Sequence, residues 1–233
     1  MPSAFVKYLF GFLLLSVLYA CERKQETEKQ ETTLFRQVNS EKSGITFRNQ
    51  LTFKDSWNII EYLYYYNGAG VAAGDINNDG LVDLFFASNE GSNTLYSNQG
   101  NLTFQDITAS AGVSSSNWST GVTMADVNND GWLDIYVCQV GGYKGQNGRN
   151  LLYINDHEGR FKEMAASYGV DFSGLSTQAA FFDYDGDGDQ DMYLHNHSVH
   201  SVESYGPAGN RGIRDEKNGD RLFKNLLIEG EAR

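Results

Sequence analysis

The sequence predicts an all-β protein built from repeated units of short strands, and three observations support this prediction. First, a nine-residue acidic loop occurs three times, each time between two short apolar runs. Second, the segments around these loops repeat with them at intervals of about 50 to 60 residues. Third, aromatic residues make up 13% of the chain, which has 25 glycines and only 2 prolines. This composition is typical of strands joined by many turns.

The first 20 residues are interpreted as a signal peptide of the lipoprotein type. Lys7 precedes an apolar run from residue 8 to residue 20, which is too short to span a bilayer and has the length of a signal-peptide core. The run ends in Leu-Tyr-Ala-Cys, which resembles a bacterial lipobox with Cys21 as the lipidated residue. The alternative is an ordinary signal peptide in which Cys21 is incidental. Residues 21–33 are rich in charge and are expected to form a disordered tether.

Residues 34–233 carry the repeated unit. The acidic loops are residues 75–83, 126–134 and 183–191. After each loop and its second apolar run comes a short strand pattern that ends in Asn, at residues 93–98, 150–155 and 220–225. A further pattern at residues 104–113 recurs at residues 161–170, and a decayed copy of it at residues 35–45 precedes the first loop.

Repeats of this length favour a β-propeller over a β-solenoid. About four apolar runs per unit fit a four-stranded propeller blade, whereas solenoid coils are usually much shorter. We therefore expect a partial propeller of about three to four four-stranded blades. Because four blades are the usual minimum for a propeller, the chain is expected to be a truncated product or a fragment of a longer protein. Its last blade would then have an unpaired edge.

The acidic loops are expected to bind calcium. Each follows the pattern D-x-[DN]-x-D-G-x-x-D, with oxygen-bearing side chains at positions 1, 3, 5 and 9. Gly at position 6 permits a sharp turn around an ion, and position 7 can offer a main-chain oxygen. Calcium accepts six to eight such oxygens at flexible angles, and the loops lack the His and Cys ligands that softer metals prefer. The alternative is that Asp, Asn and Gly merely form solvated turns.

These loops are not EF-hands, and they explain the charge of the chain. Position 12, where an EF-hand has its closing Glu, is occupied by Phe86, Val137 and Leu194, each in a strand-like run. The loops hold eleven carboxylates, which account for nearly all of the formal net charge of −12. We expect about three calcium sites, the tightest in the third loop with its five aspartates. A nucleic-acid partner is excluded because it would need a basic face.

At these loops the sequence resembles the FG-GAP/VCBS repeat family, which includes integrin α-subunit propellers and bacterial, secreted members that resemble cartilage acidic protein. The segment Tyr66-Asn-Gly-Ala-Gly70 resembles the FG-GAP part of the family signature. The resemblance implies that each loop joins two strands of a propeller blade and holds calcium. The implied side-chain ligands are Asp75, Asn77, Asp79, Asp83, Asp126, Asn128, Asp130, Asp134, Asp183, Asp185, Asp187 and Asp191. The implied main-chain ligands are the oxygens of Leu81, Trp132 and Asp189.

Other candidate residues have a structural and a functional interpretation. Three histidines, His195, His197 and His200, could ligate a transition metal, but a polar loop between blades is the simpler interpretation. Cys138 follows an apolar run and is expected in the core rather than as a reactive thiol; with Cys21 it implies neither a disulfide framework nor a zinc site. The tryptophans could stack on sugars, although packing between blades is commoner; they are Trp57, Trp118 and Trp132. The polar segment 141–150 is expected to be a flexible loop that could contact a ligand.

The expected function is recognition rather than catalysis. The chain is expected to be an exported calcium-binding propeller module, anchored by lipid at the outer membrane or cell surface of a bacterium or otherwise secreted. It would bind a cell-surface protein or glycan and would touch the membrane only through its anchor. No nucleophile elbow or phosphate-binding glycine loop indicates an enzyme. The alternatives are the propeller portion of an extracellular polysaccharide-degrading enzyme, or a scaffold fragment of a larger VCBS-repeat protein.

Overall fold

The computed structural model of the chain describes residues 33–198 and 219–227, and these residues form a mostly β structure. The chain divides into two units, Met1–Gln37 and Val38–Arg233. Of the first unit, only residues 33–37 are described, and they carry no helix or strand. The expected signal peptide, Cys21, nearly all of the tether and His200 lie outside the described residues. No helix in the described ranges is long and apolar enough to cross a bilayer.

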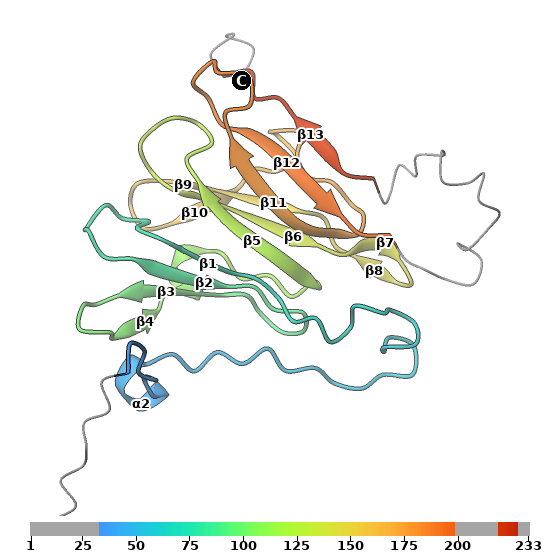
Figure 1. Cartoon of the computed structure of the whole chain (residues 1–233), viewed down its shortest axis with the longest axis horizontal. Helices are drawn as coiled ribbons and strands as arrows, with labels where there is room; N and C mark the ends of the chain where they lie inside the picture. The colour runs from blue at the N-terminus through green and yellow to red at the C-terminus, as the bar shows by residue number, and fades with distance from the viewer. Residues whose placement is uncertain (1–32, 199–218, 228–233) are drawn as a thin grey trace, which may run out of the picture. The chain divides into compact units, whose positions relative to one another are not determined.

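Two four-stranded antiparallel sheets follow one another along the second unit (Figure 1). Sheet 1 has its strands in chain order: β1 (Val71–Gly74), β2 (Asp83–Phe86), β3 (Thr94–Asn98) and β4 (Phe104–Asp106). Sheet 2 has the same order: β5 (Ser119–Ala125), β6 (Asp134–Gln139), β9 (Leu151–Asn155) and β10 (Phe161–Glu163). Each sheet is therefore the up-and-down four-stranded unit that the repeats predicted.

Sheet 3 repeats the pattern with three strands. These are β11 (Ser176–Phe182), β12 (Asp191–Asn196) and β13 (Arg221–Phe223), paired antiparallel in that order. Among the described residues no fourth strand pairs with β13. All three strand patterns that end in Asn do form a third strand, namely β3, β9 and β13.

Two elements differ from the sequence-based expectation. The segment 141–150 is not simply a flexible loop, because it contains a two-stranded hairpin, β7 (Gly141–Tyr143) and β8 (Gln146–Asn147). There are also two four-residue helices, α2 (Ser40–Ser43) and α3 (Thr108–Ala111), which an all-β prediction did not include. Helices this short show no periodicity in the sequence and depend on packing for stability.

The decayed copy of the pattern at residues 35–45 retains the short helix and its terminal glycine but not the strand. α2 ends at Gly44 and α3 at Gly112, both left-handed with φ of 74°. A Cβ atom on Gly44 would lie 2.5 Å from the carbonyl oxygen of Phe104 in β4, and one on Gly112 would lie 3.4 Å from that of Phe161 in β10. Each helix end therefore packs on the first residue of the fourth strand in the following sheet. Residues 35–37, in contrast, form no strand.

The first strands of the three sheets lie side by side (Figure 1). The Thr123 hydroxyl group of β5 donates a hydrogen bond to Ala179 O of β11 at 2.6 Å. A Cβ atom on Gly121 would lie only 2.1 Å from Thr177 O, and one on Gly70 would lie 2.9 Å from the Val122 nitrogen. Gly70 belongs to the FG-GAP-like segment, and Gly121 is its counterpart in the next unit. Both glycines let neighbouring first strands approach closely.

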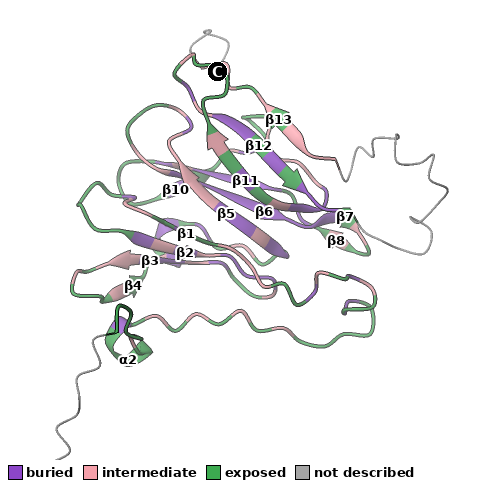
Figure 2. Cartoon of the chain, in the orientation of Figure 1, coloured by how far each residue is buried: buried purple, intermediate pink, exposed green. Residues whose placement is uncertain are grey.

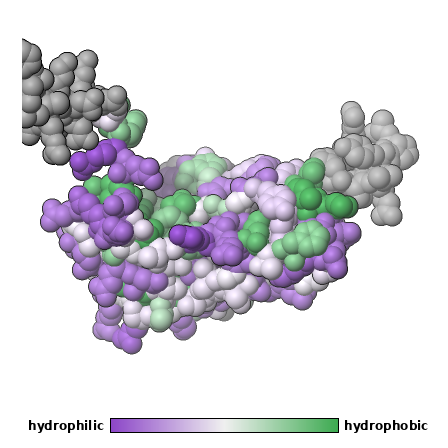
Figure 3. Space-filling view, turned by 90° about the horizontal axis from the view of Figure 1, so that it is seen from below, coloured by the Kyte–Doolittle hydropathy of each residue, from purple (hydrophilic) through white to green (hydrophobic). Residues whose placement is uncertain are grey.

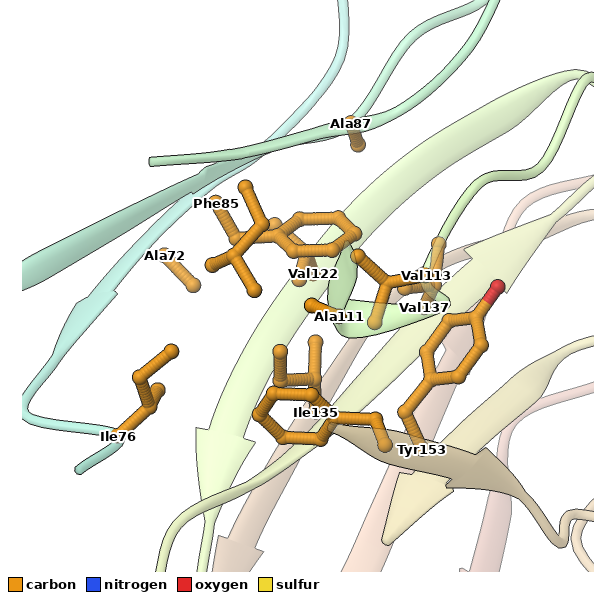
Figure 4. Packing of buried hydrophobic residues seen from close by; sticks show 12 residues of the cluster. Ala72, Ile76, Phe85, Ala87, Ala111, Val113, Val122, Ile135, Val137 and Tyr153 are labelled. Carbon is orange, nitrogen blue, oxygen red and sulfur yellow. The ribbon is translucent and has the colours of Figure 1, made fainter. Parts of the chain in front are cut away.

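The hydrophobic core lies between consecutive sheets. All six residues of β6 are buried (Figure 2). Side chains alternate along a strand, so Ile135 and Val137 join the cluster between sheets 1 and 2, shown in Figure 4, whereas Tyr136 and Cys138 join the cluster between sheets 2 and 3. Each fully buried large side chain contributes about 1.5–3 kcal/mol.

A third cluster lies at the end of the sheets where their first strands begin. It contains Trp57, Trp118 and Tyr62, and both tryptophans are only 3% exposed. They are therefore packing residues rather than open sugar-stacking surfaces. The β7–β8 hairpin packs on the same region, since the Tyr143 hydroxyl group donates to Glu61 O at 3.0 Å. The segment before β1 also has exposed hydrophobic side chains, and Figure 3 shows separate hydrophobic patches on the lower face of the molecule.

Candidate metal sites

The three acidic loops occupy equivalent places in the three sheets. Each connects the first strand of a sheet to the second: β1 to β2, β5 to β6 and β11 to β12. Because the first strands lie side by side, the loops are found at one end of the sheets, opposite the cluster of Trp57 and Trp118. The predicted strand–loop–strand arrangement is confirmed for all three loops.

One pattern of hydrogen bonds shapes each loop. In the first loop the Asp75 carboxylate at position 1 accepts the N–H groups of Asp79 at 3.1 Å and Gly80 at 2.7 Å. Asn77 Oδ1 accepts the same Asp79 N–H at 3.1 Å, so the side-chain oxygens of positions 1 and 3 converge on one point. The Asp79 carboxylate at position 5 accepts Leu81 N–H at 2.8 Å. The second loop repeats every one of these bonds, and the third repeats the contacts of positions 1 and 5.

Two positions in each loop have left-handed backbone. Position 6 is Gly80, Gly131 or Gly188, with φ between 85° and 96°, as the sequence predicted. Position 4 is also left-handed, at Asn78, Asn129 and Gly186 with φ of 57°, 59° and 79°. The sequence analysis missed position 4, although Asn and Gly are the residues that tolerate this conformation best. The Asn-Asn-Asp sequence repeated in the first two loops could have indicated the left-handed residue at position 4.

The third loop brings three carboxylates together. One oxygen from each of Asp183, Asp185 and Asp187 lies within 4.8 Å of the other two. Asp183 and Asp185 are exposed and Asp187 is half-buried, so an exposed Asp triad that can hold a cation is present. In the first two loops the middle member is Asn77 or Asn128, whose side-chain N–H donates to the position 5 carboxylate at 3.0 Å or 2.8 Å.

The aspartates at position 9 are buried and have structural contacts. Asp83 Oδ2 accepts Ile76 N–H at 3.0 Å, and Asp83 Oδ1 accepts Asn98 N–H at 2.8 Å. Asp134 and Asp191 repeat both contacts, and all three residues have no exposed surface. Burial raises the pKa of Asp83 and raises that of Asp134 to about 6, although the accepted N–H groups oppose this rise. A cation near these carboxylates would favour their ionised form.

Two loops already face a basic side chain of the protein. The Lys224 ammonium group lies 2.9 Å from Asp185 Oδ2 and 3.7 Å from Asp187 Oδ2, and it lowers the pKa of Asp185. In the second loop His157 Nε2 lies 2.9 Å from Asp130 Oδ2. The imidazole of His157 also stacks on the ring of Trp132 at a centroid distance of 5.0 Å. Trp132 is therefore a loop-packing residue.

Three asparagines at the ends of the third strands fasten the loops to the sheets. These loop-capping asparagines are Asn98, Asn155 and Asn225. The Asn155 side-chain N–H groups donate to Leu133 O in its own sheet at 3.2 Å and to Ile76 O in the loop of sheet 1 at 2.8 Å. Asn225 makes the same pair of bonds, to Gln190 O at 3.2 Å and to Val127 O at 3.0 Å.

The loops are also bonded directly to one another. The Asn78 side chain of the first loop donates to Gly131 O of the second at 3.2 Å. The Asn129 side chain of the second loop donates to Gly188 O of the third at 3.1 Å. These are again the left-handed position 4 and the position 6 glycine. The three loops thus form one chain of contacts across the sheets.

The remaining candidates lie apart from the loops. His195 Nδ1 is 3.0 Å from Asp220 Oδ1, whereas His197 Nε2 is 2.7 Å from the Tyr62 hydroxyl group. The two imidazoles therefore have different partners, which does not support a shared metal. Cys138 has no exposed surface, and burial raises the pKa of its thiol. The prediction of a core cysteine is confirmed.

Comparison with known proteins identifies the repeats. A family model described as FG-GAP-like repeat matches residues 75–137 and 140–194. Cartilage acidic protein 1 of Mus musculus is 33% identical over 179 residues, which is 72% of this chain and 26% of that protein. The Homo sapiens protein of the same name is 33% identical over 177 residues, which is 72% of this chain and 25% of that protein. The chain thus spans about a quarter of the length of these curated relatives.

Proposed function

This chain belongs to the FG-GAP-like repeat family, and from that premise we propose that it is an exported, calcium-stabilised recognition module without catalytic activity. Its three sheets are blades of a β-propeller, with the last blade represented by three strands. The observation that carries the proposal is the chain of contacts between the three acidic loops. Ions that fix these loops would fix the stacking of the sheets, and a rigid stack presents a constant surface to a partner.

Calcium fits the donor set of the loops. The triad of Asp183, Asp185 and Asp187 and the convergence of Asp75 and Asn77 on one N–H group both direct oxygens toward one point. Calcium prefers oxygen ligands of this kind. The side chains that would hold three ions are Asp75, Asn77, Asp79, Asp83, Asp126, Asn128, Asp130, Asp134, Asp183, Asp185, Asp187 and Asp191. Main-chain oxygens of Leu81, Trp132 and Asp189 would complete the three sites.

The bound ions would contribute to stability by neutralising carboxylates that otherwise repel one another. For a dissociation constant of roughly 0.1 mM and about 1 mM calcium, each site stabilises the folded chain by about 1.4 kcal/mol. Three sites add about 4 kcal/mol, which is comparable with the whole stability of a marginal domain.

Export and anchoring complete the proposal. The N-terminal segment with Cys21 supports a lipoprotein at the outer membrane or cell surface, or otherwise a secreted protein. Millimolar calcium outside the cell suits loops of moderate affinity. The partner would be a cell-surface protein or a glycan.

The proposal is tested by screening the chain against a glycan array and a library of surface proteins, in calcium and in EDTA. We expect saturable binding that EDTA abolishes, with no change in the ligand. Hydrolysis or elimination products from a polysaccharide would show that the chain is part of an enzyme rather than a recognition module. Binding that is identical in EDTA would show that the loops have no part in recognition.

A further inference from the structure

Two Asn-Gly pairs in the described residues have no part in the candidate metal sites. They are Asn67-Gly68, in the segment before β1, and Asn147-Gly148, at the end of the β7–β8 hairpin. Both asparagine side chains are exposed. An exposed asparagine followed by glycine is chemically reactive, because the glycine nitrogen can reach the asparagine carboxamide and no Cβ atom hinders its approach. The two pairs therefore place the same chemistry in two backbone settings.

The two glycines differ in how firmly their nitrogen atoms are held. Gly148 is buried, and its N–H group donates to Val140 O at 3.1 Å. A Cβ atom on Gly148 would lie 2.5 Å from the same oxygen, so this residue is tightly enclosed. Within the described ranges the Gly68 N–H group has no acceptor, and a Cβ atom on Gly68 would meet nothing within 4 Å. The Gly68 nitrogen can therefore approach its neighbour directly, whereas the Gly148 nitrogen must first lose a hydrogen bond.

We propose that Asn67 is a site of spontaneous deamidation that leads to isoaspartate. The Gly68 nitrogen attacks Asn67 Cγ and bonds to it, while the bond from Cγ to the side-chain nitrogen breaks. Ammonia leaves with the Gly68 amide proton, and a cyclic imide remains. Water then opens the imide, and opening at the main-chain carbonyl gives isoaspartate. The reaction consumes only water, needs no partner and goes beyond the proposed function.

The modified position directly precedes a segment that is bonded to the rest of the protein. Gly68 O accepts the side-chain N–H group of Asn89 at 3.1 Å, and Asn89 is only 3% exposed. Gly70 N–H donates to Thr120 O of β5 at 2.5 Å, which joins the start of sheet 1 to sheet 2. Isoaspartate at position 67 lengthens the main chain by one methylene and adds a carboxylate. The residues that follow are displaced from their partners, so the modification weakens this joint between the sheets.

The reaction is tested by ageing the full chain in calcium at mildly alkaline pH, in water that carries an oxygen isotope label. Peptide mapping by mass spectrometry follows each Asn-Gly pair, and electron-transfer fragmentation distinguishes isoaspartate from aspartate. We expect Asn67 to take up one labelled oxygen atom about tenfold faster than Asn147, a ratio equivalent to about 1.4 kcal/mol between the two barriers. Equal rates at Asn67 and Asn147, or faster conversion of Asn147, would overturn the proposal.

Asn67→Gln is the matched control for the chemistry. Glutamine keeps the carboxamide, but attack by the next nitrogen would have to close a larger and less favourable ring. The Asn67 side chain is exposed and bonds to no residue in the described part of the chain, so the variant is expected to fold as the unaltered chain does. We expect it to take up no label at position 67 and to leave the rate at Asn147 unchanged. Uptake at position 67 in this variant as fast as in the unaltered chain would refute the imide route.

Urea unfolding of the aged proteins tests the structural consequence. We expect the aged unaltered chain to unfold at a lower urea concentration than Asn67→Gln aged in parallel, because only the former contains isoaspartate at position 67. Freshly prepared Asn67→Asp adds the carboxylate without lengthening the main chain, and it should unfold like the fresh unaltered chain. Equal midpoints for the two aged proteins would show that the modification leaves the joint between sheets 1 and 2 intact. A fresh Asn67→Asp midpoint as low as that of the aged chain would assign the loss to charge and contradict the role of chain length.

Discussion

The loop-capping asparagines allow a direct test of how the sheets are joined, by comparing Asn155→Ala with Asn98→Ala. Both side chains accept the N–H group two residues later, at 3.0 Å for Asn155 and 2.9 Å for Asn98. Both also donate to a carbonyl of their own sheet, Leu133 O at 3.2 Å and Val82 O at 2.9 Å. Only Asn155 donates in addition to a neighbouring sheet, at Ile76 O.

The largest difference between the two variants is the bond between sheets. The contact of Asn155 with Ile76 O is buried, and Asn155 itself is 3% exposed. Removing a partner from a buried carbonyl costs about 1–3 kcal/mol. Both variants lose a turn bond and a bond to their own sheet; the latter is part-buried for Asn155 and exposed for Asn98, so it adds to the larger loss expected for Asn155→Ala. We therefore expect Asn155→Ala to lower the free energy of unfolding by about 1–3 kcal/mol more than Asn98→Ala does.

The assay is urea unfolding in 1 mM calcium, followed by far-ultraviolet circular dichroism and tryptophan fluorescence. Agreement of the two signals and equal slopes would show that the same transition is compared in each variant. Equal destabilisation by the two substitutions, within about 0.5 kcal/mol, would refute the claim that Asn155 joins sheet 1 to sheet 2. Greater destabilisation by Asn98→Ala than by Asn155→Ala would also contradict this claim.

Three further predictions concern the loops and the first strands. Lys224→Gln is expected to raise calcium affinity about fivefold by removing a charge that competes for Asp185, and unchanged affinity in isothermal titration calorimetry would contradict this. In EDTA, the melting temperature should rise as the pH falls from 7.5 to 5.5, because the pKa of Asp134 is raised to about 6 in the folded chain and the folded chain therefore binds the proton more tightly than the unfolded chain. The stability gained from this proton is complete below the unfolded pKa of 3.8 and is lost above about pH 6. With calcium bound, acidification should instead lower the melting temperature, because protonated carboxylates bind calcium more weakly. A melting temperature that falls with pH in EDTA would contradict the prediction for Asp134. Gly121→Ala should destabilise the chain by more than Gly74→Ala in urea unfolding, since its Cβ would meet backbone oxygen at 2.1 Å whereas that of Gly74 would meet movable side-chain ends.

The sequence predicted most of the elements because their signals are local and repeated. Each acidic loop has turn residues in register with strand-like flanks, so three weak signals support one another. The strand patterns that end in Asn predicted β3, β9 and β13. The aspartate triad of the third loop was likewise predictable, since alternating carboxylates on a tight loop must converge.

The remaining features depend on contacts that no local pattern encodes. The role of Asn155 was not predictable, although its position was, because its acceptor at Ile76 lies 79 residues earlier in the chain. Glycine is required at position 121 because the carbonyl oxygen of Thr177 in the next sheet leaves no room for a Cβ atom. The pairing of Lys224 with the third loop also joins distant segments, and it opposes the simple expectation that more aspartates give a tighter site.

The free energy of unfolding in 1 mM calcium and in EDTA tests the central claim most directly. Urea titrations of the full chain, with magnesium as a control for ionic effects, give the difference. If calcium in the three loops holds the sheets together, calcium should add about 4 kcal/mol and magnesium much less. Superimposable unfolding curves in calcium and EDTA would contradict the account.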